Sequence, residues 1–153
     1  MKELKNMNDD AKKYWDEFWQ GNEPHPLDAW KFGVIPDELA KMVVVGRKTT
    51  TTSTYAGYEA RNESIPHIGK CSIILDSKDK PVGIIEVINV KVMPMNEVPM
   101  GHRANEGDCG ADGELWWDVH EEYFTSILAE RGEAFSEDML VVCEEFKLID
   151  SRA

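Results

Sequence analysis

Apolar residues recur every three or four positions near the start of the chain and predict an amphipathic helix over about residues 8–20. Asn8 or Asp9 can cap its first turn, and Gly21 follows its last. The apolar face carries Ala11, Tyr14, Trp15, Phe18 and Trp19. Because aromatic residues at helical spacing usually belong to a core, we expect Trp15 and Trp19 to pack against the rest of the domain.

A second amphipathic helix is predicted from Pro36 to the residue before Gly46. Proline suits the first turn of a helix because its missing N–H would have no partner there. The apolar positions are Leu39, Met42 and Val43. Since Gly46 ends this helix, its C-terminal end leads directly into Arg47 and Lys48.

Beyond residue 69 the pattern changes to β-branched runs. Residues 70–76 and 81–92 flank a polar turn and predict a β-hairpin, and residues 139–149 predict another strand. A helix is predicted over residues 113–132. Its apolar residues at helical spacing are Leu115, Val119, Tyr123 and Ile127. Strands and helices of unequal length, without regular alternation, predict an α+β fold: a small β-barrel or a strongly curved mixed sheet flanked by helices.

The composition fits a single domain spanning residues 1–153, because 42% of the residues are hydrophobic and no linker divides the chain. No apolar run reaches the ~18 residues of a membrane span, and the N-terminal segment lacks the apolar core of a secretory signal. These features predict a soluble, cytoplasmic protein without membrane contact. Three distant cysteines without a C-x-x-C pair predict neither a disulfide framework nor a zinc finger.

The acidic balance limits the possible partners. The formal net charge is -12, whereas binding to duplex nucleic acid depends on neutralisation of phosphates by Lys and Arg. We therefore expect no binding to duplex DNA. A small nucleoside-like ligand or a local contact with single-stranded RNA is easier to accommodate. The sequence indicates no particular oligomeric state.

Against this acidic background, the stretch GRKTTTTST at residues 46–54 gathers two cations and a run of hydroxyls. A site that holds a polar ligand would account for it. A β-strand with a hydroxyl face, preceded by a lysine that favours the C-terminal end of a helix dipole, also accounts for it, from structure alone.

Two acidic residues, Glu86 and Glu144, lie within the predicted strands among apolar neighbours. By strict alternation, Glu86 shares a face with Ile84 and Ile88. Burial of an isolated carboxylate is costly, so each is expected to pair with a cation such as Arg47, to accept hydrogen bonds, or to lie on a wet face.

Several motifs occur in a fixed order over about residues 14–149. They are W-x-F-G at 30–33, P-D-E-L-A…G-x-K-T at 36–49, Y-E at 58–59, P-x-x-G…I-x-x-D at 66–76, I-I-E-V-x-x-V at 84–90, H-x-x-x-E-G at 102–107, W-x-x-x-H at 116–120 and V-x-C-E-x-F at 141–146. This ordered combination resembles the ASCH family, whose members have a PUA-like β-barrel fold, and it is more specific than any single motif.

The resemblance implies a function related to RNA or nucleosides. PUA-like domains are associated with RNA, some ASCH relatives are described as ribonucleases, and small bacterial members as amidohydrolases that remove the acetyl group of acetylcytidine. In these amidohydrolases, a Lys and a Thr of G-x-K-T-x-T and a Glu of H-A-x-x-E form the catalytic set, which by motif falls on Lys48, Thr51 and Glu106. Larger relatives carry E-G-E-G-D where this chain has EGDCG at residues 106–110.

The implied mechanism is hydrolysis. Thr51 would be the nucleophile, Lys48 the base that takes its proton, and Glu106 the group that exchanges a proton at the leaving amine. Arg47 or backbone N–H groups would oppose the oxyanion. We therefore expect these four side chains to converge on one cleft.

A non-catalytic module that binds RNA or a nucleotide is the alternative function. The residues expected to bind substrate are Arg47, Thr49, Trp30, Tyr58, Glu86 and Arg103. Among them, Trp30 and Tyr58 are predicted in loops, where they could stack on a base. No cofactor is expected. No metal is expected either, because His102 and Glu106, four residues apart, lack a third ligand at diagnostic spacing.

Overall fold

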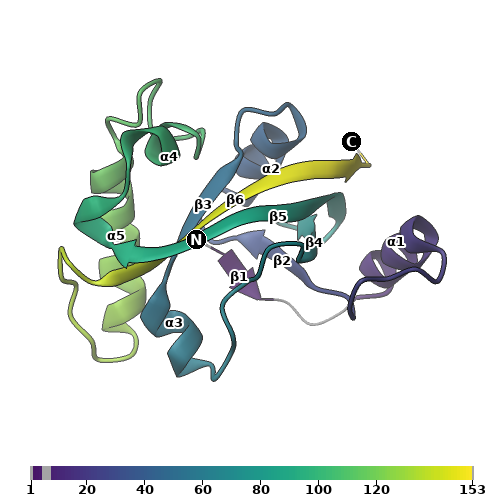
Figure 1. The fold of residues 1–153 in the computed structure, drawn as a ribbon, viewed down its shortest axis with the longest axis horizontal. Helices are drawn as coiled ribbons and strands as arrows, with labels where there is room; N and C mark the ends of the chain where they lie inside the picture. The colour runs from purple at the N-terminus through teal and green to yellow at the C-terminus, as the bar shows by residue number, and fades with distance from the viewer. Residues whose placement is uncertain (1, 5–7, 153) are drawn as a thin grey trace.

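The computed structural model describes residues 2–4 and 8–152 and shows one sheet flanked by helices (Figure 1). In chain order, the elements are β1 (Lys2–Leu4), α1 (Asp9–Trp19), β2 (Ala29–Phe32), α2 (Pro36–Val44), β3 (Thr50–Thr54), α3 (Tyr55–Ala60), β4 (Cys71–Leu75), β5 (Pro81–Pro94), the short helix η1 (Met95–Glu97), α4 (Met100–Ala104), α5 (Trp116–Ala129) and β6 (Leu140–Ser151). Within the described residues, six strands pair in the order β1-β2-β4-β5-β6-β3. Among the strand pairs that the described residues form, only β2–β4 is parallel. The predicted α+β fold with a mixed sheet is confirmed.

The predicted N-terminal helix is confirmed as α1. Asn8 caps it, because its Oδ1 accepts a hydrogen bond from the backbone N–H of Ala11 at 2.7 Å. Tyr14 and Trp15 are buried in a cluster with side chains of β2, β4 and β5, and Trp19 packs at the edge of that cluster. This apolar face holds α1 on the sheet.

The second predicted helix is confirmed as α2, which begins at Pro36 and packs its apolar face on β2. After α2, the backbone N–H groups of Arg47 and Lys48 both donate to the Met42 carbonyl, at 2.9 and 3.1 Å. This tight turn leaves Lys48 two residues before the start of β3.

The predicted hairpin is confirmed as β4 and β5, and β6 pairs along the length of β5. The β5–β6 register shifts between Val87 and Asn89. Such a bulge breaks the alternation of faces, so Ile88 is 41% exposed whereas Ile84 is fully buried. The expectation that Glu86 shares one face with Ile84 and Ile88 is therefore wrong.

The predicted helix near residues 113–132 is confirmed as α5, but its buried face differs from the predicted one. The predicted face included Leu115, which is 52% exposed. The buried residues lie one position further along the chain and are Trp116, His120, Phe124 and Leu128. Two of them are polar-tipped aromatic side chains that contact a buried carboxylate, which hydropathy alone does not predict. No helix within residues 2–4 and 8–152 is long and apolar enough to cross a membrane.

Gly113 fixes the loop between α4 and α5. Its φ is +74°, and a Cβ there would lie 2.7 Å from the backbone nitrogen of Ala104. A non-glycine residue in the left-handed conformation costs roughly 1–2 kcal/mol of stability. Gly113→Ala should lower the free energy of unfolding by clearly more than this, because the steric clash adds to that cost. Gly21→Ala is the matched control, because Gly21 has a φ of +85° and, apart from its chain neighbours, none of the described residues has an atom within 4 Å of the added Cβ. Equal losses of free energy of unfolding in urea titrations would contradict the predicted steric effect.

Candidate functional site

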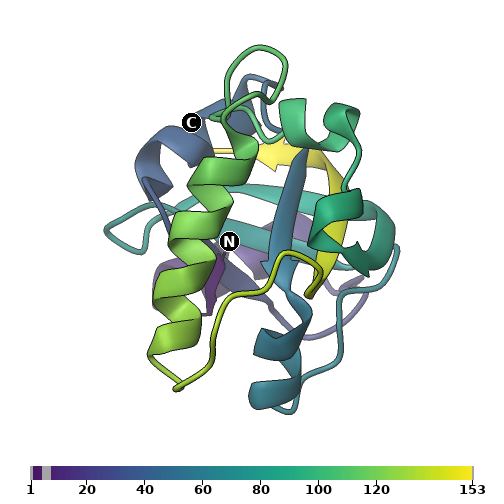
Figure 2. The same ribbon diagram turned by 90° about the vertical axis from the view of Figure 1, so that its left-hand side faces the viewer.

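Three segments that are distant in the sequence meet at one end of the molecule, where α4, α5 and β3 lie together (Figure 2). The backbone joins two of them, because the carbonyl of Asn105 accepts hydrogen bonds from the N–H groups of Thr49 and Thr50 at 2.9 and 3.3 Å. The Thr50 hydroxyl also donates to the backbone carbonyl of His102 at 2.8 Å. α4 is thus fixed against the start of β3.

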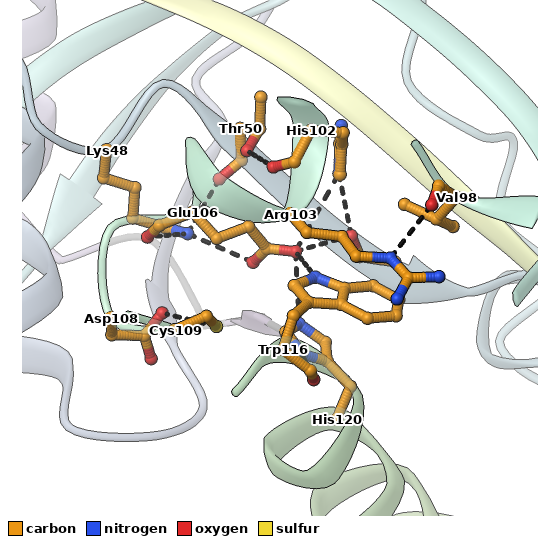
Figure 3. A network of polar contacts seen from close by, with 11 residues as sticks. Lys48, Thr50, Val98, His102, Arg103, Glu106, Asp108, Cys109, Trp116 and His120 are labelled. Carbon is orange, nitrogen blue, oxygen red and sulfur yellow. Dashed lines mark hydrogen bonds and ion pairs between the residues drawn. The ribbon is translucent and has the colours of Figure 1, made fainter. Parts of the chain in front are cut away.

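Glu106 is the centre of a buried polar network at this junction (Figure 3). Its side chain is 1% exposed, and Oε1 lies 3.3 Å from the Lys48 ammonium. The other oxygen, Oε2, accepts hydrogen bonds from the Thr52 hydroxyl at 2.6 Å and from the Trp116 indole N–H at 2.7 Å. His120 Nε2 lies 3.1 Å from Oε2, within ion-pair distance but without hydrogen-bond alignment.

The carboxylate of Glu106 stays charged despite its burial. Desolvation raises its pKa, but the positive charges of His120 and Lys48, together with hydrogen bonds, outweigh this effect and hold the pKa well below 4.5. His120 Nδ1 lies 2.8 Å from the backbone carbonyl of Trp116, and this contact fixes the ring beside the carboxylate.

Lys48 is fully engaged inside the network. Its Nζ donates to the carbonyl of Thr50 at 2.7 Å and to the carbonyl of Glu106 at 3.1 Å, in addition to the Glu106 carboxylate. An ammonium has three N–H donors, so these contacts use all of them. Lys48 is 2% exposed, and its contacts are those of a fixed buried charge.

Alternation along β3 decides which threonines reach this network. Thr50 and Thr52 contribute hydroxyls to it, whereas the intervening Thr51 lies on the other face of the strand. Thr51 Oγ1 is buried and has no hydrogen-bond partner among the residues described. The structure therefore brings Lys48 and Glu106 together, as expected from the sequence, but it does not bring Thr51 to them.

His102 connects the network to a cavity. Its side chain is 12% exposed, and its Nε2 lies 2.9 Å from the Thr52 hydroxyl oxygen. Burial lowers the pKa of His102 below 6.5, and the charge of Lys48 adds to this effect while Glu106 opposes it. The imidazole is therefore neutral near neutral pH, and it can accept or donate a proton.

The His102 cavity, as we name it, has a volume of about 190 Å³. It lies between β3, β5, β6 and α4, and both charged and amide side chains surround it. Its lining residues are Thr50, Asn89, Lys91, Met93, Pro99, His102, Asn105, Cys143 and Glu145. The cavity thus offers hydrogen-bond donors and acceptors directly beside the buried charges.

The predicted substrate-binding residues are not all gathered at this cavity. Trp30 lies on β2 and Tyr58 on α3, 1% and 4% exposed, so the prediction that they are loop residues is wrong. Both aromatic rings complete the core.

Glu86 pairs with Lys147 at 3.4 Å, which is the cation pairing expected for this carboxylate.

The remaining three predicted substrate-binding residues border the network. Arg47 is exposed, and its Nε donates to the Gly107 carbonyl at 3.2 Å. Thr49 is half-buried before β3. The guanidinium of Arg103 stacks over the ring of Trp116 at 4.7 Å from its centroid and holds the network from outside.

Sequence reasoning missed Thr52, Trp116 and His120 as members of the site. Two signals could have found them. The alternation of β3 places Thr52, and not Thr51, on the same side as Thr50. The motif W-x-x-x-H places Trp116 and His120 one helical turn apart on α5.

A larger cavity of about 620 Å³ lies between α2 and the β4–β5 turn, away from the network. Lys41, Lys78 and Arg152 are among its lining residues, and none of the sequence-predicted site residues is. We place the candidate site at the smaller cavity because the buried charges and the neutral histidine are there.

Comparisons with known proteins agree with this architecture. Protein EF3133 from Enterococcus faecalis V583, known from a crystal structure, is 32% identical, with a TM-score of 0.85 over 93% of this chain and 89% of that one. The ASCH domain from Lactobacillus crispatus JV V101 shares the fold with a TM-score of 0.85 at 23% identity, over 95% of this chain and 98% of that one. None of the curated proteins matches significantly. The sequence model of the ASCH domain matches residues 28–150, and the chain therefore belongs to the ASCH domain family.

Proposed function

We propose that this ASCH domain protein binds a small nucleoside-like ligand in the His102 cavity and hydrolyses an acylated amino group on it. The observation that carries the proposal is the Glu106 network immediately beside the cavity. Buried ion pairs contribute little to stability compared with well-packed apolar residues, so a cluster of buried charges next to a cavity points to function.

The cavity favours a polar heterocycle as ligand. Asn89 and Asn105 offer amide groups, Glu145 an acceptor and Lys91 a donor, and this mixture can read the edge of a nucleobase. Ligand-binding cavities commonly measure about 300–1,000 Å³, so a cavity of about 190 Å³ fits only the reacting part of a nucleoside. The net charge of -12 also disfavours ligands with many phosphates.

The reaction needs a nucleophile, a base and donors for the oxyanion. Water serves as the nucleophile in this proposal, because Thr51 lies outside the network. Lys48 and Glu106 act as fixed charges that shape the field in the cavity, and the Lys91 ammonium or the amide groups oppose the developing oxyanion. The proposal therefore keeps two of the three residues implied by the family resemblance and changes their roles.

A non-catalytic binding module is the second candidate. One observation favours it: the side chains of Lys48 and Glu106 are both only 1% exposed. Charges buried to this extent do not contact a bound ligand directly. A single strand of RNA is the partner to test in that case. Few cations surround the site, so the slope of log affinity against log salt should be shallow, about -2 to -3.

Binding and turnover of cytidine and N4-acetylcytidine test the proposal. We expect acetate release from the acetylated nucleoside, and about 10-fold weaker binding in Lys91→Met and Glu145→Gln, which each remove one charged hydrogen-bonding group. Lys41→Met, in the larger cavity, is the matched control and should bind like the wild type. Binding without turnover would support the non-catalytic module, whereas no effect of either cavity variant would contradict the location of the site.

A further inference from the structure

We infer that Thr52 and Glu106 hold neutral His102 in the tautomer protonated on Nε2, which leaves Nδ1 as the proton acceptor of the His102 cavity. Thr52 and Glu106 are positioning residues in this inference, and His102 is the general base. The catalytic part rests on the proposed function. The tautomer itself rests on the hydrogen-bond geometry together with the charge states of Glu106 and His102 described above.

The direction of the hydrogen bonds follows from the donors available. An ionised carboxylate can only accept, so the proton of the Thr52 hydroxyl goes to Glu106 Oε2, 2.6 Å away. The Thr52 oxygen can then only accept from His102 Nε2 at 2.9 Å. A neutral imidazole carries one N–H, so Nδ1 must be the nitrogen with the lone pair.

The surroundings keep this arrangement in place. The hydrogen bond from Thr50 to the His102 carbonyl fixes the backbone of α4. The charged groups that act on the ring have mixed signs and offset one another. Glu106 and Glu144 favour a protonated ring, Lys48 and His120 disfavour it, and Lys91 and Glu145 line the same cavity. Burial tips this balance toward the neutral ring.

A complete hydrolysis can be written with this base. His102 Nδ1 takes a proton from water while the water oxygen bonds to the acyl carbon. The C–N bond then breaks as the protonated His102 returns that proton to the leaving nitrogen. The products are a carboxylic acid and a free amine, and His102 ends neutral as it began. The role of the carboxylate resembles that of the acid in a catalytic triad, with the Thr52 hydroxyl inserted between acid and imidazole.

Nitrogen-15 NMR of the histidine side chains of the whole protein tests the tautomer without any substrate. We expect the Nε2-protonated form for His102 in the wild type and a mixture of tautomers in Thr52→Val. Thr51→Val is the matched control, since this neighbouring buried hydroxyl has no partner in the described part of the chain. An Nδ1-protonated ring in the wild type would overturn the inference, whether or not any variant folds.

Kinetics with an acetylated nucleoside test the catalytic role separately. In Thr52→Val, we expect kcat to fall by about 10-fold or more with little change in KM, and in His102→Gln by about 100-fold or more. Thr52→Ser should restore both the tautomer and kcat. Loss of turnover in Thr51→Val would assign the nucleophile to Thr51 and overturn the role of His102. The expected tautomer without turnover of any acylated nucleoside would overturn the proposed function and leave the positioning by Thr52 intact.

Discussion

Replacing Glu106 with glutamine is expected to lower the free energy of unfolding by about 3–5 kcal/mol. The amide keeps the shape of the side chain but removes the negative charge that compensates Lys48, whose Nζ lies 3.3 Å away. The 1% exposure of both side chains leaves water little opportunity to solvate the uncompensated ammonium. Since total stabilities of small domains are about 5–15 kcal/mol, the loss would be a large share of the whole.

Glu86→Gln is the matched control for this measurement. Glu86 also contacts a lysine, Lys147 at 3.4 Å, but the two side chains are 32% and 58% exposed. We expect a loss below about 1 kcal/mol, as is usual for ion pairs in contact with water. Urea titrations at neutral pH give both values. A Glu106→Gln loss no larger than that of Glu86→Gln would show that the network contributes no electrostatic stabilisation.

The wild type is expected to lose stability on acidification through two groups of the site. The folded state depresses the pKa of His102 below 6.5, so its contribution is complete above that pH and is lost as the pH falls through the lower folded value. The pKa of Glu106 is depressed well below 4.5, so its contribution is lost only in more acidic solution. Within its own pH window, each group can lower the free energy of unfolding by up to about 1.4 kcal/mol for each pH unit of acidification.

The difference in unfolding free energy between the wild type and Glu106→Gln measures the acidic window. It should be constant near neutral pH and should shrink once the pH falls below 4.5, because protonated Glu106 resembles glutamine. Asp37→Asn is a useful comparison, since Asp37 also has a lowered pKa but is held by Ser77 at the surface. A wild-type advantage that stays constant down to about pH 3 would contradict ionised Glu106 as the source of the stabilisation.

The helices and the hairpin could be predicted from the sequence because their signals are local. Asn8 and Pro36 mark helix starts, and β-branched runs mark β4 and β5. The family motifs also predict that Lys48 and Glu106 lie close together, although they are distant in the sequence. No local periodicity could predict this contact. The contact between them carries the central part of the candidate site.

Other features of the site could not be read from local patterns. The bulge after Val87 depends on how β5 fits β6, so simple alternation places Ile88 on the wrong face of the strand. The buried face of α5 depends on a carboxylate from another segment, which holds Trp116 and His120. The sequence presents His102 only as a candidate metal ligand, because its partner, the Thr52 hydroxyl, is known only from the tertiary structure.

The pairing of β3 with β6 has a consequence for the order of folding. It joins Thr50–Thr54 to residues 141–145, whereas the β4–β5 hairpin is closed by a short turn. Contacts between distant segments require the closure of long loops and form slowly, so the hairpin should form early and the β3–β6 ladder late. The charged groups of the Glu106 network would then remain hydrated during most of the folding reaction. They would lose their water when β3 pairs with β6.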